Sequence, residues 1–374
     1  MDASGIRATY ADQLTWPDDR LLAWAASVVA VPRADPADSF VLHAPLELLA
    51  RAALLSRVEP SGRDRARERV VWLADRYAGA GDGVRVPTAP DHGSVGEGCA
   101  ALVKAIAAGD LDEVDRHAAW LAARASVAEL RAGLGTAVAP MLAAAAHAPI
   151  LLHLMGHVPT LGPGLLRGPV RELARRPDQS VPVEGLASGS GPLVDALLDT
   201  PLLGPPDSTF ILPMVRHGQA AAARLLTDVA ADPVGARAAV SRVAAWAMVQ
   251  EGPDHVPYGW THALTIPQAV LSLGLEPRLA VAVAGSQLVG LRASMGTRRL
   301  DPDAPLPATA DLGPADLVTA ASRHGDAHVV KYTLAALDAA DHDPACRDLY
   351  LAAANRLHEW WWAQPDDGFF APAG

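Results

Sequence analysis

Residues 322–344 read SRHGDAHVVKYTLAALDAADHDP, an apolar helical pattern that carries histidines and a lysine. If this segment is one helix, His324, His328 and Lys331 lie at positions i, i+4 and i+7 and share a face. In the alternative interpretation, one helix ends before Asp326, and this aspartate caps a second helix, which leaves His324 in the connection. In both interpretations His328 and Lys331 are neighbours.

The lysine of this segment is one of very few. The chain has 31 lysine and arginine residues, but its only lysines are Lys104 and Lys331. Arginine stays protonated in proteins, whereas a buried lysine can lose its proton and react. Lys331 is therefore a candidate for chemistry. The alternative is a lysine whose aliphatic stem lies along a helix surface with its charge in water.

Apolar residues recur at helical spacing through most of the 374 residues, and runs of alternating β-branched residues are missing. The pattern predicts an all-α fold, a single domain of many helices around a central apolar cavity. Glycine and proline are dense at 161–208, which predicts an irregular connection or a lid between two helical halves at about 1–160 and 209–374. In the second half, helices are predicted at about 213–228, 234–250, 265–275, 276–291, 314–323, 327–340 and 343–362.

Composition excludes several classes of protein. A formal net charge of −11 without a basic run argues against nucleic-acid partners and anionic membrane surfaces. The two cysteines cannot form a disulfide framework, and the N-terminus lacks the features of a signal peptide, so we expect a cytoplasmic protein. Residues 132–166 contain no charged side chain and are long enough to cross a bilayer, but their four prolines and many alanines favour a buried central helix.

Motifs for nucleotides, dinucleotides, serine hydrolases and HExxH zinc enzymes are missing from the chain. The remaining candidates are histidines on or beside apolar helices: His43, His147, His153, His262 and His328. A lone histidine of this kind is usually a hydrogen-bonded core residue. Several of them each need a polar partner, and a shared metal would satisfy them together. A set rich in imidazole and free of thiols suits iron, zinc or copper.

Four short motifs carry a resemblance to a known family. His43-Ala-Pro-Leu, the helix of His147, Thr261-His262-Ala-Leu-Thr-Ile-Pro and His328-Val-Val-Lys331 occur in the order, and with roughly the spacing, of the histidine-bearing segments of questin oxidase-like proteins. The resemblance spans about residues 35–355. It implies an all-helical oxygenase that acts with dioxygen on polycyclic aromatic polyketides such as anthraquinones, by Baeyer–Villiger-type oxygen insertion or by oxidative ring cleavage.

The resemblance also implies a site. Some members of the family are described as binding iron through four histidines and a carboxylated lysine, and others as needing no cofactor. On this chain the corresponding residues, catalytic or ligating an Fe(II) ion, are His43, His147, His262, His328 and Lys331. The chain departs from the family pattern in the alanine and proline that follow His147, and His153 competes for that role.

Further expectations concern the substrate and partners. His153, Arg323 and Trp260 are candidate contacts for an aromatic polyketide. Without a cofactor, a histidine would deprotonate a phenol, and the resulting anion would reduce dioxygen directly. The alternatives are a non-catalytic helical protein that binds an aromatic metabolite and a zinc hydrolase with histidine ligands. The tryptophans at 360–362 indicate an interface, such as that of a homodimer.

Overall fold

The computed structural model describes residues 1–34, 38–85, 88–208, 210–252, 256–308, 312–362 and 369. Over these residues the chain folds into helices, with isolated β-bridges and no strand, so the prediction of an all-α fold is confirmed. Among the described helices, none is both long enough and apolar enough to cross a membrane.

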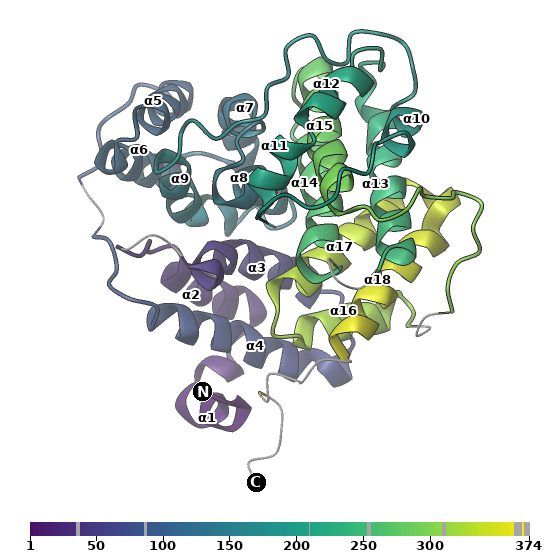
Figure 1. Cartoon of the computed structure of the whole chain (residues 1–374). Helices are drawn as coiled ribbons and strands as arrows, with labels where there is room; N and C mark the ends of the chain where they lie inside the picture. The colour runs from purple at the N-terminus through teal and green to yellow at the C-terminus, as the bar shows by residue number, and fades with distance from the viewer. Residues whose placement is uncertain are drawn as a thin grey trace.

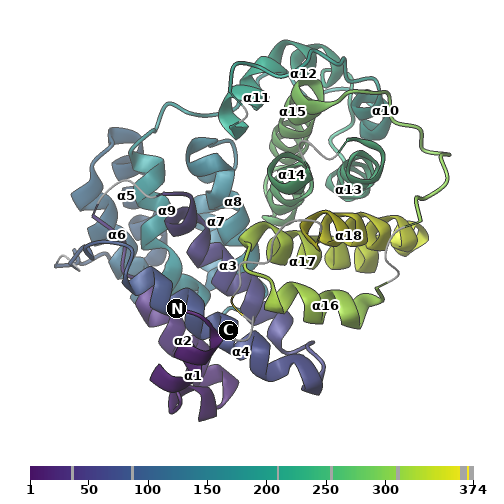
Figure 2. The ribbon, with the colours of Figure 1, turned by 60° about the horizontal axis from the view of Figure 1, so that its bottom comes forward.

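The helices form two groups, which Figures 1 and 2 show side by side. The first group contains α1 (Ala3–Thr9), α2 (Asp18–Val29), α3 (Ser39–Leu55), α4 (Pro60–Ala78), α5 (Val95–Ala108), α6 (Leu111–Arg124), α7 (Val127–Val138), α8 (Ala143–Met155) and α9 (Arg167–Ala174). The second contains α10 (Leu193–Leu198), α11 (Ile211–His217), α12 (Gln219–Leu225), α13 (Pro233–Gln250), α14 (Thr261–Ser272), α15 (Pro277–Met295), α16 (Pro314–Arg323), α17 (Ala327–His342) and α18 (Arg347–Trp362).

The two groups meet along four helices. Helix α3 packs on α8 and α17, and α14 packs on the same two helices, so the four close a ring. Two of its members come from each group. The middle turns of these helices are buried on almost every side: α14, for example, buries every described residue from Thr261 to Leu271. Helices without a solvent-exposed face are typical of the centre of a large core.

Local sequence signals explain where the helices begin. Asp38 accepts a hydrogen bond from the Val41 amide and starts α3, and Ser126 with Glu129 forms a reciprocal capping box at α7. Between α16 and α17 the chain leaves helical geometry at His324, and the Asp326 side chain caps α17. The interpretation with two helices in residues 322–344 is therefore confirmed.

Two expectations about residues 132–208 were wrong. Residues 161–208 are not wholly irregular, because they include α9 and α10. Residues 132–166 hold the second part of α7 and the whole of α8, instead of one central helix. Pro45, of the His43-Ala-Pro-Leu motif, lies inside α3, which begins at Ser39 after the Asp38 cap.

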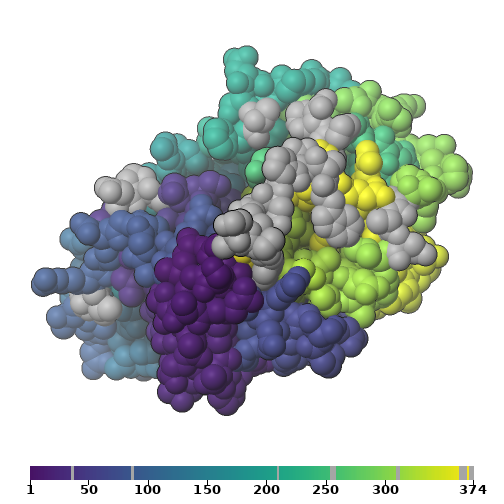
Figure 3. Space-filling model, turned by 90° about the horizontal axis from the view of Figure 1, so that it is seen from below, coloured from purple at the N-terminus to yellow at the C-terminus, as the bar shows by residue number. Residues whose placement is uncertain are grey.

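The N-terminal helices cover one outer face. Figure 3 shows their residues in purple, next to α4 and α16. Helix α4 packs on both α1 and α16, and α16 in turn packs on α17. The N-terminal helices therefore support, through α4 and α16, the helix that carries His328 and Lys331.

Close contact between α11 and α15 provides a test of this packing. A Cβ atom on Gly290 would lie 2.5 Å from Val215 Cα and 2.9 Å from its carbonyl oxygen. Because the backbone of α11 cannot yield easily, we expect Gly290→Ala to lower the free energy of unfolding by about 1–3 kcal/mol in urea titrations. Gly285→Ala is the control on the same helix.

In the control, the new methyl group would meet the methyl groups of Leu226 at 3.0 and 3.1 Å, and a side chain can turn away. Alanine also favours a helix interior over glycine by about 1 kcal/mol, so Gly285→Ala should be nearly neutral. Equal losses in the two variants would contradict the close approach of α11 and α15.

Candidate metal centre

Helix α3 presents His43 to the centre of the ring in one orientation. The Nδ1 atom of His43 donates a hydrogen bond to the Ser39 carbonyl, one turn earlier. His262 repeats the arrangement on α14, where its Nδ1 atom donates to the Tyr258 carbonyl. A ring nitrogen that donates to a carbonyl carries the proton, so the Nε2 atom of each ring is left with a free lone pair.

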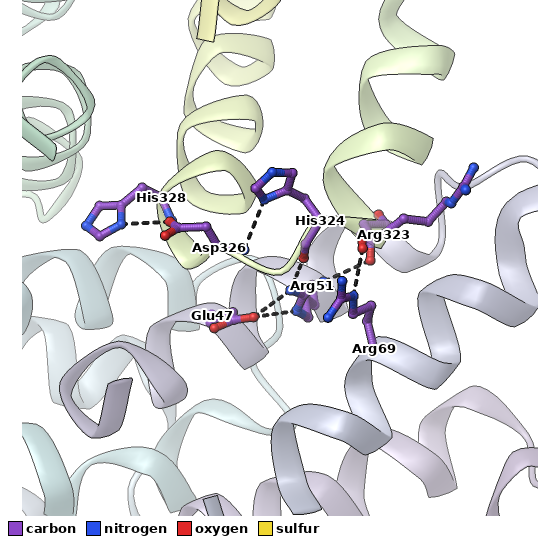
Figure 4. Close-up of polar contacts among 8 residues, drawn as sticks. Glu47, Arg51, Arg69, Arg323, His324, Asp326 and His328 are labelled. Carbon is purple, nitrogen blue, oxygen red and sulfur yellow. Dashed lines mark hydrogen bonds and ion pairs between the residues drawn. The ribbon is translucent and has the colours of Figure 1, made fainter. Parts of the chain in front are cut away.

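His328 is held by a carboxylate. The Asp326 Oδ1 atom accepts hydrogen bonds from the His328 backbone amide at 2.7 Å and from its Nδ1 atom at 2.8 Å, as Figure 4 shows. The helix cap therefore also fixes the imidazole. Carboxylate or carbonyl partners on the outer nitrogen are the usual support of histidines that bind metals.

The four imidazoles meet in one place. Ring centroids are 4.4 Å apart for His43 and His147, and 4.4 Å for His43 and His328. They are 5.8 Å apart for His147 and His262, and 5.1 Å for His262 and His328. One nitrogen from each of His43, His147 and His262 lies within 4.8 Å of the other two. Side chains predicted from the sequence to share a site are thus neighbours.

The inner atoms of this cluster lack partners. Within the described part of the chain, His43 Nε2, His262 Nε2, both ring nitrogens of His147 and Lys331 Nζ are buried and make no hydrogen bond. A buried polar group left without a partner costs roughly 1–3 kcal/mol. Several such atoms converge here, and nitrogen atoms of imidazole and amine groups are common ligands of transition metals. The residues therefore fit a metal ion.

Burial sets the charge states of the cluster. It lowers the pKa of all four imidazoles well below 6.5, and the positive charge of Lys331 lowers these pKa values further. Burial also lowers the pKa of Lys331 from 10.5 to about 8, although the carboxylates of Asp326 and Glu47 oppose the shift. At neutral pH the imidazoles are therefore neutral, the form that binds metals.

A second layer of charged residues positions Asp326. Arg51 Nε donates to Glu47 at 2.8 Å, and the same guanidinium donates to the carbonyls of Ser322 at 2.8 Å and His324 at 2.5 Å. Figure 4 shows these bonds reaching from α3 to the turn between α16 and α17. Arg69 adds a bond of 2.7 Å to the Arg323 carbonyl. Together the two arginines fix the turn from which Asp326 reaches His328.

The sequence analysis missed the role of Glu47 and Arg51, and treated Asp326 only as a helix cap. A signal for the first two was present, because His43, Glu47 and Arg51 recur every fourth residue along an otherwise apolar helix. Both are almost fully buried, at 2% exposure each. Charged residues in that pattern indicate a polar stripe that the core must accommodate.

The three candidate substrate contacts have other partners or point in other directions. His153 pairs with Ser272 and faces Asp338. In Figure 4 the Arg323 side chain points away from His328. Trp260 is fully buried, and the Arg292 guanidinium lies 5.7 Å from its ring centroid, so its face is not open to a substrate. Position along the chain could not show these orientations.

Two accessible features flank the cluster instead. Tyr258, in a π-helical turn at Val256–Trp260, is 58% exposed, and its ring centroid lies 4.9 Å from that of His328. On the side of α8 and α9, a pocket lined largely by apolar residues, including Val41 and Pro169, reaches His147. The sequence analysis did not identify Tyr258. A π-turn is rare and frequently marks a functional site.

The backbone is strained just before His147. Ala144, Ala145 and Ala146 have φ values of 52°, 54° and 58°, in the left-handed region. This conformation costs an alanine roughly 1–2 kcal/mol. Backbone strain of this kind clusters at active and binding sites, so its position next to His147 agrees with a functional role for this histidine.

The pKa of Lys331 yields a test in protein free of metal and bicarbonate. Below about pH 8 Lys331 is charged in both the folded and the unfolded chain, and burial of that charge lowers the free energy of unfolding. We therefore expect Lys331→Met to be more stable than the wild type by about 3 kcal/mol at pH 7. The difference should shrink between about pH 8 and 10.5, where only the unfolded lysine keeps its proton.

Urea titrations across that range measure the effect. Lys104 is exposed, so Lys104→Met should show no such dependence on pH. A difference between Lys331→Met and the wild type that stays constant from pH 7 to 10.5 would contradict the buried ammonium.

Comparison with known proteins adds no assignment for this centre. No protein-family model and no curated protein matches the chain. The interpretation of the centre therefore depends on the contacts and the burial of its own residues.

Proposed function

We propose that the protein is an iron-dependent oxygenase of a polycyclic aromatic polyketide, of the anthraquinone type. One observation carries the metal centre: four imidazoles and one lysine of lowered pKa converge in the core, and the inner atoms of His43, His147, His262 and Lys331 make no hydrogen bond within the described residues. A protein gains nothing in stability from such a set unless a ligand completes it. The choice of iron, the reaction with dioxygen and the substrate class rest on the resemblance of the histidine motifs to those of questin oxidase-like proteins.

The residues that would hold the ion are His43, His147, His262 and His328, with Lys331 as a fifth ligand once carbon dioxide has added to its amine. That addition needs the neutral amine, which the lowered pKa of Lys331 makes available near neutral pH. The carbamate would place one negative charge among four neutral ligands. Bound there, iron would supply the capacity to bind and activate dioxygen.

The chain itself contributes orientation and exclusion of water. Ser39, Tyr258 and Asp326 hold the outer nitrogens of three rings, which keeps each Nε2 lone pair directed inward. Apolar residues of α3, α8, α14 and α17 surround the cluster and keep bulk water away from a reactive centre. The exposed ring of Tyr258 beside His328 is a surface on which a planar aromatic substrate could stack.

The charge states favour this proposal over oxygenation without a cofactor. A general base works best when its pKa lies near the operating pH. Burial holds the pKa of each cluster histidine well below 6.5, which makes these imidazoles weak bases for a phenol. The same lowered pKa removes the competition between protons and metal ions.

The test uses protein made without a histidine tag and loaded with Fe(II) in the absence of oxygen. We expect one iron per chain at the buried centre, and dioxygen uptake when a hydroxylated anthraquinone is added, with oxygen gained by the product in mass spectrometry. His262→Ala removes a ligand, and Lys331→Arg keeps a positive charge but cannot form the carbamate, so both should lose uptake at least a hundredfold.

His217→Ala is the matched control, because this histidine is exposed at the end of α11. Iron content unchanged by His262→Ala would refute the metal centre. Tight binding of the anthraquinone without dioxygen uptake would instead identify a binding protein, and activity with zinc on an ester or amide would identify a hydrolase.

The carboxylate on His328 provides a separate test by metal affinity. Asn in place of Asp326 can still cap α17 but cannot offer a charged acceptor to the His328 Nδ1–H group. We expect Asp326→Asn to weaken Co²⁺ or Fe²⁺ affinity roughly 10–100-fold in competition with a chelator. Asp316→Asn, on the exposed side of α16, should change nothing. Equal affinities for the two variants would show that Asp326 only caps the helix.

A further inference from the structure

A second group of potential ligands lies at the far end of two helices of the ring. His153 is in the last turn of α8, His157 follows that helix, and Asp338 lies about one turn before the end of α17. The Asp338 Oδ2 atom lies 3.1 Å from His157 Nε2 and 3.9 Å from His153 Nε2. Asp338 follows Lys331 by seven residues, about 10 Å along the helix, so this group is separate from the buried centre.

The tautomer of His153 leaves its inner nitrogen free. Ser272 Oγ lies 2.6 Å from His153 Nδ1, and the same hydroxyl donates to the Ala269 carbonyl at 2.7 Å. Since a hydroxyl has one hydrogen, Ser272 must accept from the Nδ1–H group. The lone pair of Nε2 is then available on the side of Asp338.

We propose that His153, His157 and Asp338 form a second metal site, for a divalent first-row ion such as Zn²⁺ or Fe²⁺. The three ligand atoms lie within 4.8 Å of one another. Two imidazole nitrogens and a carboxylate oxygen form the donor set of open metal sites, in which water or a substrate completes the coordination. The side chains are 12%, 26% and 13% exposed, so an ion can enter from solvent.

Helix ends contribute to the field at this site. The C-terminal parts of α8, α14 and α17 meet at the group, through His153, Ser272 and Asp338, and the C-terminal ends of helices carry partial negative charge. Two arginines act in the opposite sense. Arg131 donates to the Ser272 carbonyl at the end of α14, and the positive charge of Arg237 interacts with Asp338. The second site should therefore bind an ion more weakly than a centre with four imidazoles and a carbamate.

The proposal does not depend on the oxygenase function, and Co²⁺ tests it, because the absorption spectrum of this ion reports its ligands. Equilibrium dialysis of wild-type protein should reveal a second, weaker Co²⁺ equivalent beside that of the buried centre. His157→Ala and Asp338→Asn should each weaken that equivalent at least tenfold and change the spectrum, and His217→Ala should have no effect. Both ligands are partly exposed, so these variants should fold, as thermal unfolding can check.

His262→Ala separates this proposal from the function proposed above. That variant should lose the tight equivalent and keep the weak one. If the wild type binds a single Co²⁺ that His157→Ala removes and His262→Ala retains, the second site stands and the buried metal centre fails. Unchanged binding and an unchanged spectrum in both His157→Ala and Asp338→Asn would overturn the second site.

Discussion

The structure depends on one costly arrangement, the burial of polar atoms without partners where α3, α8, α14 and α17 meet. Each orphaned nitrogen lowers stability by roughly 1–3 kcal/mol, and the buried ammonium adds to that cost. The surrounding residues nevertheless hold three of the four rings in fixed orientations. The outer nitrogens of His43, His262 and His328 are hydrogen-bonded, whereas both ring nitrogens of His147 and the Nε2 atoms of His43 and His262 have no partner among the described residues.

Arginine and lysine have different roles around this cluster. Arginine, which keeps its charge and offers several fixed donors, holds the frame: Arg51 joins α3 to the turn before α17, and Arg292 is buried with Glu251. Lysine, which can change its charge, is placed where a change matters, at Lys331. Arginines around the cluster and a lysine within it suit a site whose residues must be ordered before the ligand binds.

The all-α class could be predicted from the sequence, because helical spacing is a local signal. Spacing could not show that the four histidines and Lys331 meet, and that expectation came from the resemblance of their motifs to those of questin oxidase-like proteins. The contacts of Arg51 could not be predicted, since its partners Ser322 and His324 lie in the other half of the chain. The directions of side chains could not be predicted either: nothing in the order of residues shows that Arg323 points away from His328 or that His153 pairs with Ser272.

The contact between the two helix groups affects when the cluster can form during synthesis and folding. His43 emerges from the ribosome long before His328, yet their rings touch in the final structure. Contacts between residues so distant in sequence form late, because the intervening chain must first be ordered. Neither half can assemble the cluster alone. An ion bound there would reach its ligands only after synthesis is complete. It would then join the two helix groups and slow their separation during unfolding.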